Sequence, residues 1–173
     1  SRFVEITYLL TAVNLGKYGL ANLQIADDLD GVFSGVGAQI HSVQVRADSN
    51  LTLNPRYTGR GADTVLITNG NLPAGKSSRI WLVVRIDVSQ ASTLTFSNKA
   101  TVQAVDANGG ICRDRSTNGT EVDPDQNGNP GDNDEPTLLT LHSLQAEGSE
   151  TVFIPEGFSP NNDGINDRFV LQG

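Results

Sequence analysis

Alternation of apolar and polar residues is the dominant pattern along the chain. In residues 79–88, every second position from Ile80 to Val88 is aliphatic, and Arg79, Arg85 and Asp87 fall on the opposite face. A repeat of two places successive side chains on opposite faces of a strand, so this segment predicts a half-buried β-strand. The same pattern predicts strands over 4–12, 93–105, 21–26, 40–47, 64–68, 137–144 and 151–154.

Seven or more short strands, with no helical repeat of useful length, predict an all-β protein. Two sheets that each bury one face against the other satisfy this pattern, so we expect an immunoglobulin-like antiparallel β-sandwich. Trp81 falls on the outward face, either as a contact for a neighbouring domain or beneath an overlying loop. The predicted core includes Ile80, Leu82, Val84, Leu94, Phe96 and Val102.

Residues 123–134 have the spacing of a calcium-binding loop. Asp and Asn alternate at the first, third and fifth positions, and Gly128 permits a sharp turn at the sixth. Prolines exclude flanking helices, so the loop is expected between strands. The twelfth position is an Asp where helix-flanked loops prefer Glu. The predicted ligands are Asp123, Asp125, Asn127, Asn129, Asp132 and Asp134.

The charge distribution favours a cation at this loop. Residues 114–135 hold seven carboxylates against Arg115, a net charge of −6 out of −8 for the whole chain. Such crowding is unfavourable unless a cation or water screens it. The alternative is a solvated turn cluster, which Asn, Asp and Gly also form.

Composition excludes several classes of function. The chain has 173 residues, 18 Gly, 7 Pro and no Met, and Cys112 is its single cysteine. One cysteine excludes an internal disulfide and a cysteine-based zinc site. The acidic balance argues against nucleic acid as a partner, and no apolar run is long enough for direct membrane insertion. Because the chain lacks a starting Met, we expect it to be part of a longer protein.

The sequence lacks the pattern of an enzyme. His41 and His142 are the only neutral-pH bases, and neither lies in a recognisable nucleophile context. The carboxylates of the acidic loop are not expected to face each other across a rigid cleft, as glycosidase carboxylates do. We therefore expect no catalytic residues and a non-enzymatic protein.

Several short segments resemble the immunoglobulin-like repeat domain of large bacterial surface adhesins. They are Tyr8-Leu-Leu-Thr-Ala-Val-Asn14-Leu-Gly16, where a first hairpin would turn, Ile25-Ala-Asp-Asp-Leu29, Asn71-Leu-Pro73-Ala-Gly75 and Ser97-Asn98-Lys-Ala-Thr-Val102. Residues 114–136 are similar to the acidic insertion of versions of this domain from Bacteroidota adhesins. The resemblance covers about residues 3–145 and implies a stalk or adhesive role, with neighbouring domains, surface glycans or other surface proteins as partners.

The C-terminal part has a sharper resemblance. Val152-Phe-Ile-Pro155-Glu-Gly-Phe158-Ser-Pro160-Asn-Asn-Asp163-Gly164-Ile-Asn-Asp167-Arg-Phe169 resembles the opening of the gliding-motility-associated C-terminal domain. That family is the type B sorting signal of the type IX secretion system, whose translocon components would then be partners. The resemblance implies secretion to the outer cell surface. It predicts a division into a sandwich domain, residues 1–147, and a linker with the start of a sorting domain, residues 148–173.

The same C-terminal segment contains a second set of oxygen ligands. Asn161, Asp163 and Asp167 match the third, fifth and ninth positions of a calcium loop, but the first position would be Ser159. A rigid turn between two strands fits these residues slightly better. The sequence thus predicts a calcium-stiffened, non-catalytic module of a secreted adhesin. The alternative is an accessory module of a secreted polysaccharide-degrading enzyme.

Overall fold

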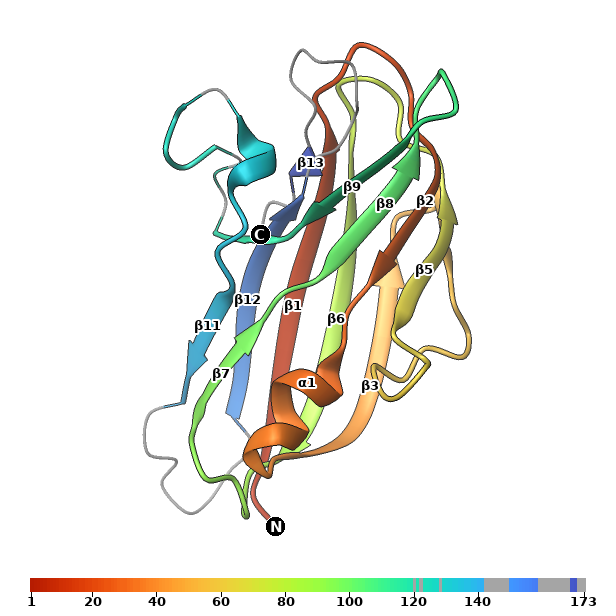
Figure 1. Cartoon of the computed structure of the whole chain (residues 1–173). Helices are drawn as coiled ribbons and strands as arrows, with labels where there is room; N and C mark the ends of the chain where they lie inside the picture. Colours follow the sequence, from red (N-terminus) through yellow and green to blue (C-terminus); the bar gives the residue numbers. More distant parts are fainter. Residues whose placement is uncertain (120, 122, 128, 142–149, 159–168, 171–173) are drawn as a thin grey trace.

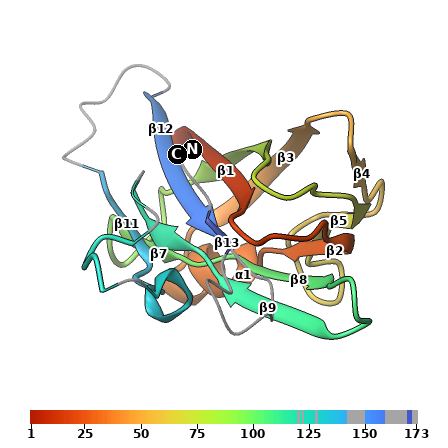
Figure 2. The same cartoon turned by 90° about the horizontal axis from the view of Figure 1, so that it is seen from above.

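The chain folds as an all-β sandwich, which confirms the predicted fold class. The computed structural model describes residues 1–119, 121, 123–127, 129–141, 150–158 and 169–170. Two main sheets pack face to face, and a two-stranded sheet extends one side (Figure 1). Seen from above, the sheets form two layers (Figure 2), and a short helix lies toward the lower end of the sandwich in Figure 1.

The first sheet has the order β10-β12-β1-β6-β3, with β13 pairing the end of β1. Its long strands carry the predicted alternation: Ile80, Leu82 and Val84 are fully buried, and their neighbours face outward. The strands of this sheet are β1 (Phe3–Asn14), β3 (Gln39–Ala47), β6 (Ser77–Asp87), β10 (Thr117–Asn118), β12 (Glu150–Phe158) and β13 (Phe169–Val170).

The second sheet has the order β4-β5-β2-β8-β9, and a separate pair joins β11 to β7. Its inward residues complete the core; Phe96 and Val102 are buried as predicted, and Leu94 is partly buried against them. The strands are β2 (Ala21–Ala26), β4 (Leu51–Leu53), β5 (Val65–Gly70), β7 (Thr95–Asn98), β8 (Thr101–Val105), β9 (Ile111–Arg115) and β11 (Thr137–Thr140).

A short helical segment, which the sequence did not predict, follows β2. It consists of α1 (Leu29–Phe33) and the 3₁₀ turn η1 (Ser34–Val36). Leu29 and Phe33 are fully buried, and the Phe33 ring lies 5.1 Å from that of Phe96. Apolar packing therefore holds the helix although it is too short to be stable alone. No helix among the described residues is long and apolar enough to cross a membrane.

The connection after β1 differs from the predicted hairpin. Strands β1 and β2 lie in different sheets, so the chain crosses from one layer to the other at Asn14. The buried Asn14 side chain donates to the carbonyl oxygens of Tyr18 and Leu72, at 2.8 and 2.9 Å, and accepts from Gly16 N–H. These bonds replace the strand ladder that a hairpin would have supplied.

Strand β12 changes the predicted division of the chain. Residues 150–158 pair in parallel with β1, from Val4 opposite Glu150 to Ala12 opposite Phe158. Ile154 is 8% exposed, and Val152 packs against the core. The predicted boundary at residue 148 therefore does not separate this strand from the sandwich, because the sandwich buries apolar residues that an isolated hairpin leaves exposed.

Trp81 lies on the outer face of the first sheet, as the alternation predicts. The guanidinium carbons of Arg46 and Arg79 stand 5.4 and 5.3 Å from the centre of its ring. Arg46 is directly opposite Trp81 on β3, and Arg79 is two residues away on β6. Cation–π contacts with these neighbours keep the indole half-buried.

Candidate metal centre

The acidic loop connects β10 to β11 and is closed at its base by a backbone hydrogen bond. Asn118 N–H donates to the Glu135 carbonyl oxygen at 2.9 Å. Between these residues the chain turns at Asp123 to Gln126, where Gln126 has a left-handed φ of 54°, and forms the 3₁₀ turn η2 (Pro130–Asp132). Gly128, the predicted turn residue, lies outside the described residues.

Four side chains of the loop converge as a polar cluster. The Asn127 side-chain amide donates to Asp125 Oδ2 at 2.8 Å and to Asp132 Oδ2 at 3.1 Å. The Asn133 side-chain amide donates to Asp132 Oδ1 at 3.1 Å, and its nitrogen lies 3.4 Å from Asp125 Oδ1. Two predicted ligands, Asp125 and Asp132, are therefore held together by amide groups.

One further predicted ligand, Asn129, is tied to this cluster through its backbone. The Asn129 carbonyl oxygen accepts from the Asn133 amide at 3.2 Å, and Asn129 N–H donates to Asn127 Oδ1 at 2.6 Å. Asn127 thus turns its nitrogen toward the carboxylates and its oxygen toward the backbone. A half-turn of this amide would direct three side-chain oxygens, from Asp125, Asn127 and Asp132, toward one point.

The neighbouring polar groups change the pKa of the Asp125 carboxyl. Partial loss of water raises the pKa of its carboxyl, but hydrogen bonds with the Asp123 side chain and with Asn127 N–H outweigh this effect. The net result is that the pKa of Asp125 lies below its ordinary value. Asp125 is therefore ionised at neutral pH, as a carboxyl that ligates a cation must be.

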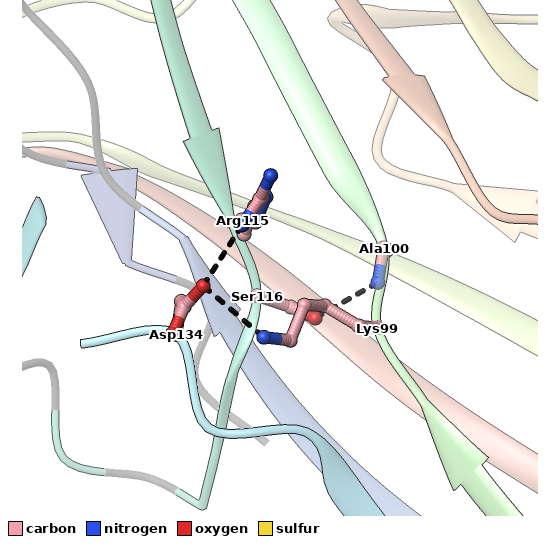
Figure 3. Close-up of polar contacts among 5 residues, drawn as sticks. All are labelled: Lys99, Ala100, Arg115, Ser116 and Asp134. Carbon is pink, nitrogen blue, oxygen red and sulfur yellow. Dashed lines mark hydrogen bonds and ion pairs between the residues drawn. The ribbon is translucent and has the colours of Figure 1, made fainter. Parts of the chain in front are cut away.

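Asp134, the predicted twelfth ligand, is held by two cations of the protein. Its Oδ2 lies 3.2 Å from Lys99 Nζ and 3.1 Å from Arg115 Nη1 (Figure 3). Hydrogen bonds from Lys99 and then Arg115 hold the pKa of Asp134 below its usual range. These ion pairs fasten the end of the loop to β9 and to the turn between β7 and β8.

A second contact in the same region holds the strand ends together. Ala100 N–H donates to Ser116 Oγ at 2.9 Å, and Ser116 N–H donates to the Ala100 carbonyl oxygen at 2.9 Å (Figure 3). Ser116 is buried, so this reciprocal pair is shielded from water. The strand that leads into the acidic loop is therefore held in place by buried hydrogen bonds.

The described residues contain no group of three or more His, Cys, Asp and Glu side chains close enough to hold a metal ion. A cation at this loop would therefore need amide and backbone oxygens in addition to Asp125 and Asp132. The second predicted site, formed by Asn161, Asp163 and Asp167, lies outside the described residues. Calcium binding stays a prediction at both places.

A buried carboxyl that the sequence analysis missed lies at the end of β2. Asp27 is 1% exposed, and its Oδ2 accepts from the Asn98 side-chain amide at 2.9 Å. Burial raises the pKa of Asp27 to about 6, although the bond from Asn98 opposes the rise. The alternation Leu23, Ile25, Asp27 places this residue on the inward face, which is the signal that could have identified it.

Comparison with known proteins found no matching family model, no similar curated protein and no similar solved structure.

Proposed function

We propose that the chain is a non-catalytic, load-bearing module of a secreted protein on the outer cell surface, with a stalk or adhesive role. The observation that carries this proposal is the parallel pairing of β1, near the start of the chain, with β12, near its end. The two strands run side by side in the same direction (Figure 1).

The mechanical consequence follows from the direction of the strands. A force that pulls the chain apart through its two ends acts at Phe3 on β1 and beyond Phe158 on β12, which are opposite ends of the pair. Such a force loads the nine residue pairs between Val4 and Ala12 together, along the strand axes. Because every interstrand hydrogen bond must yield at nearly the same time, this arrangement resists extension more than one that opens bond by bond.

The neighbouring strands support β1 under this load. On its other side β1 pairs antiparallel with β6 over eleven residue pairs. Its inward residues Val4, Ile6, Tyr8 and Leu10 are fully buried. Strand β1 is thus fixed by two ladders and by the core.

Single-molecule force spectroscopy with two attachment geometries tests the proposal. Handles at residues 1 and 173 load the β1–β12 pair lengthwise, whereas handles at residue 1 and at Glu150→Cys pull at one end of the pair and open it stepwise. Both experiments use a chain that carries Cys112→Ala, so that the cysteine introduced at residue 150 is the single thiol to which the second handle can attach. We expect a several-fold higher unfolding force for the first geometry. Equal forces in the two geometries would refute the load-bearing assignment.

The proposal includes export by the type IX secretion system and stiffening by calcium. The resemblance of residues 152–169 to a type B sorting domain supports the first part, and the convergence of Asp125, Asn127 and Asp132 supports the second. Because β12 belongs to the sandwich, deleting it would disrupt the sheet. Export is better tested by fusing the native C-terminal sequence from residue 148 onward to a reporter, and secretion without that sequence would contradict the assignment.

A further inference from the structure

The outer face of the second sheet carries a cleft that the proposed function does not use. Its volume is about 780 Å³, within the range of about 300 to 1,000 Å³ that small-molecule sites occupy. The floor is formed by β2, β8 and β9, and residues of the acidic loop, Gly131, Asp132 and Asp134, stand at one side. The cleft therefore lies where the sheet meets the loop.

Strand register explains why the sheet is hollow at this place. Ala26, Thr101 and Arg115 lie directly opposite one another across β2, β8 and β9. Two of these three residues are small, so the middle of the row is low. Arg115 is drawn toward the loop by its bond to Asp134 at 3.1 Å.

The neighbouring row is formed by long polar side chains. Gln24, Gln103 and Arg113 are also directly opposite one another on the same three strands. Gln103 Nε2 donates to Gln24 Oε1 at 2.7 Å, which holds both amides in place along one wall. Each amide keeps further donor or acceptor capacity, and Arg113 is exposed with a fork of N–H donors.

Charged side chains of both signs line the cleft. Arg113 and Arg115 contribute two positive charges, and Asp132 and Asp134 contribute two negative charges. Asp134 is paired with Arg115, and Asp132 accepts hydrogen bonds from the Asn127 and Asn133 amides, so neither carboxylate presents an unpartnered charge to the cleft.

We infer that this cleft binds an uncharged, polyhydroxylated ligand, namely a neutral glycan chain. Hydroxyl groups match the paired donors and acceptors of Gln24, Gln103 and Thr101. An apolar ligand would leave these polar groups without partners. The described lining residues include no aromatic ring, so affinity comes from hydrogen bonds rather than ring stacking.

This inference rests on the adhesive part of the proposed function, to which it gives a ligand class. The load-bearing part does not depend on it. The force measurement is made without a glycan, so its result tests the load-bearing proposal alone and leaves the test of glycan binding independent.

Isothermal titration of the full 173-residue chain tests the inference. The probes are uncharged cello-, xylo-, manno- and malto-hexasaccharides, with hexagalacturonate as an anionic probe. We expect saturable binding of at least one uncharged probe. No saturable binding of any of them, or binding of hexagalacturonate alone, would overturn the proposal.

Two variants and a matched control locate the site. Thr101→Tyr fills the hollow from an exposed strand position where tyrosine is well tolerated, and should weaken binding about tenfold or more. Thr52→Tyr makes the same change at an exposed position of β4, outside the cleft, and should bind as the unmodified chain does. If Thr101→Tyr does not fold, as judged by its melting temperature, Arg113→Gln replaces it. Unchanged affinity in the folded cleft variant would overturn the assignment.

Discussion

The buried carboxyl of Asp27 makes a sharp prediction about stability and pH. Asp27 is 1% exposed, its Oδ2 accepts from Asn98, and its Oδ1 has no hydrogen-bond partner among the described residues. Burial raises the pKa of this carboxyl from 3.8 to about 6. The folded chain therefore holds the Asp27 proton more tightly than the unfolded chain does.

Linkage between protonation and folding gives the direction and size of the effect of Asp27 on the free energy of unfolding. The contribution of Asp27 to the free energy of unfolding is fully present below about pH 3.8 and is lost as the pH rises through about 6. The difference between the two pKa values corresponds to about 3 kcal/mol. Above that pH the fold contains a buried carboxylate with a single amide to stabilise it.

The perturbation is Asp27→Asn, which keeps the shape of the protonated side chain and removes its titration. Denaturant unfolding of both proteins at pH 4 and pH 8 gives the difference in free energy of unfolding at each pH. We expect this difference to move in favour of Asn by about 2 to 3 kcal/mol between the two pH values, because at pH 4 the unfolded chain is already partly ionised at this carboxyl. Asp63→Asn, which makes the same substitution at an exposed position, is the control.

A comparison between two proteins at each pH is needed because other carboxyls also change stability with pH. Asp87, Asp125 and Asp134 have lowered pKa values and therefore stabilise the fold only at higher pH, so the whole protein can still lose stability in acid. Their contributions cancel in the comparison. A difference that does not change between pH 4 and pH 8 would refute the argument that burial controls Asp27.

Two further predictions concern the core and the acidic loop. Leu82→Ala should cost about 2 to 5 kcal/mol of unfolding free energy, because Leu82 is fully buried on the central strand β6, and a cost below about 1 kcal/mol would contradict the assigned face. Excess chelator should lower the melting temperature if calcium binds only the folded loop. Asp125→Ala should abolish that effect and Asp63→Ala should preserve it, and a melt that is identical with and without chelator would exclude a stabilising calcium ion.

The alternation of residues determined which face each strand buries. Ile80, Leu82 and Val84 follow one another at every second position, and a strand must place them on one side. Burying that side requires a second apolar layer, so an all-β sandwich follows from the sequence. The position of Asp27 on the inward face was available from the same pattern.

The acidic loop was partly predictable. The spacing of Asp125, Asn127 and Asp132 indicated side chains that approach one another, and the structure brings them together. It could not indicate that Asp134 is held by Lys99 and Arg115. These partners lie 35 and 19 residues away along the chain and reach it only when the end of β7 and β9 lie beside the loop.

The choice of strand neighbours was decided only by the tertiary structure. Alternation specifies the faces of a strand but not which strands flank it, because every strand offers the same backbone donors and acceptors along its edges. The sequence therefore indicated a strand near residue 152 without showing that it would pair in parallel with β1. The sequence also predicted a hairpin at Asn14. In the structure the chain crosses there to the second sheet, and the buried Asn14 amide donates to the carbonyl oxygens of Tyr18 and Leu72. Packing of Val152 against the core and burial of Ile154 within it are the physical reason that β12 lies beside β1.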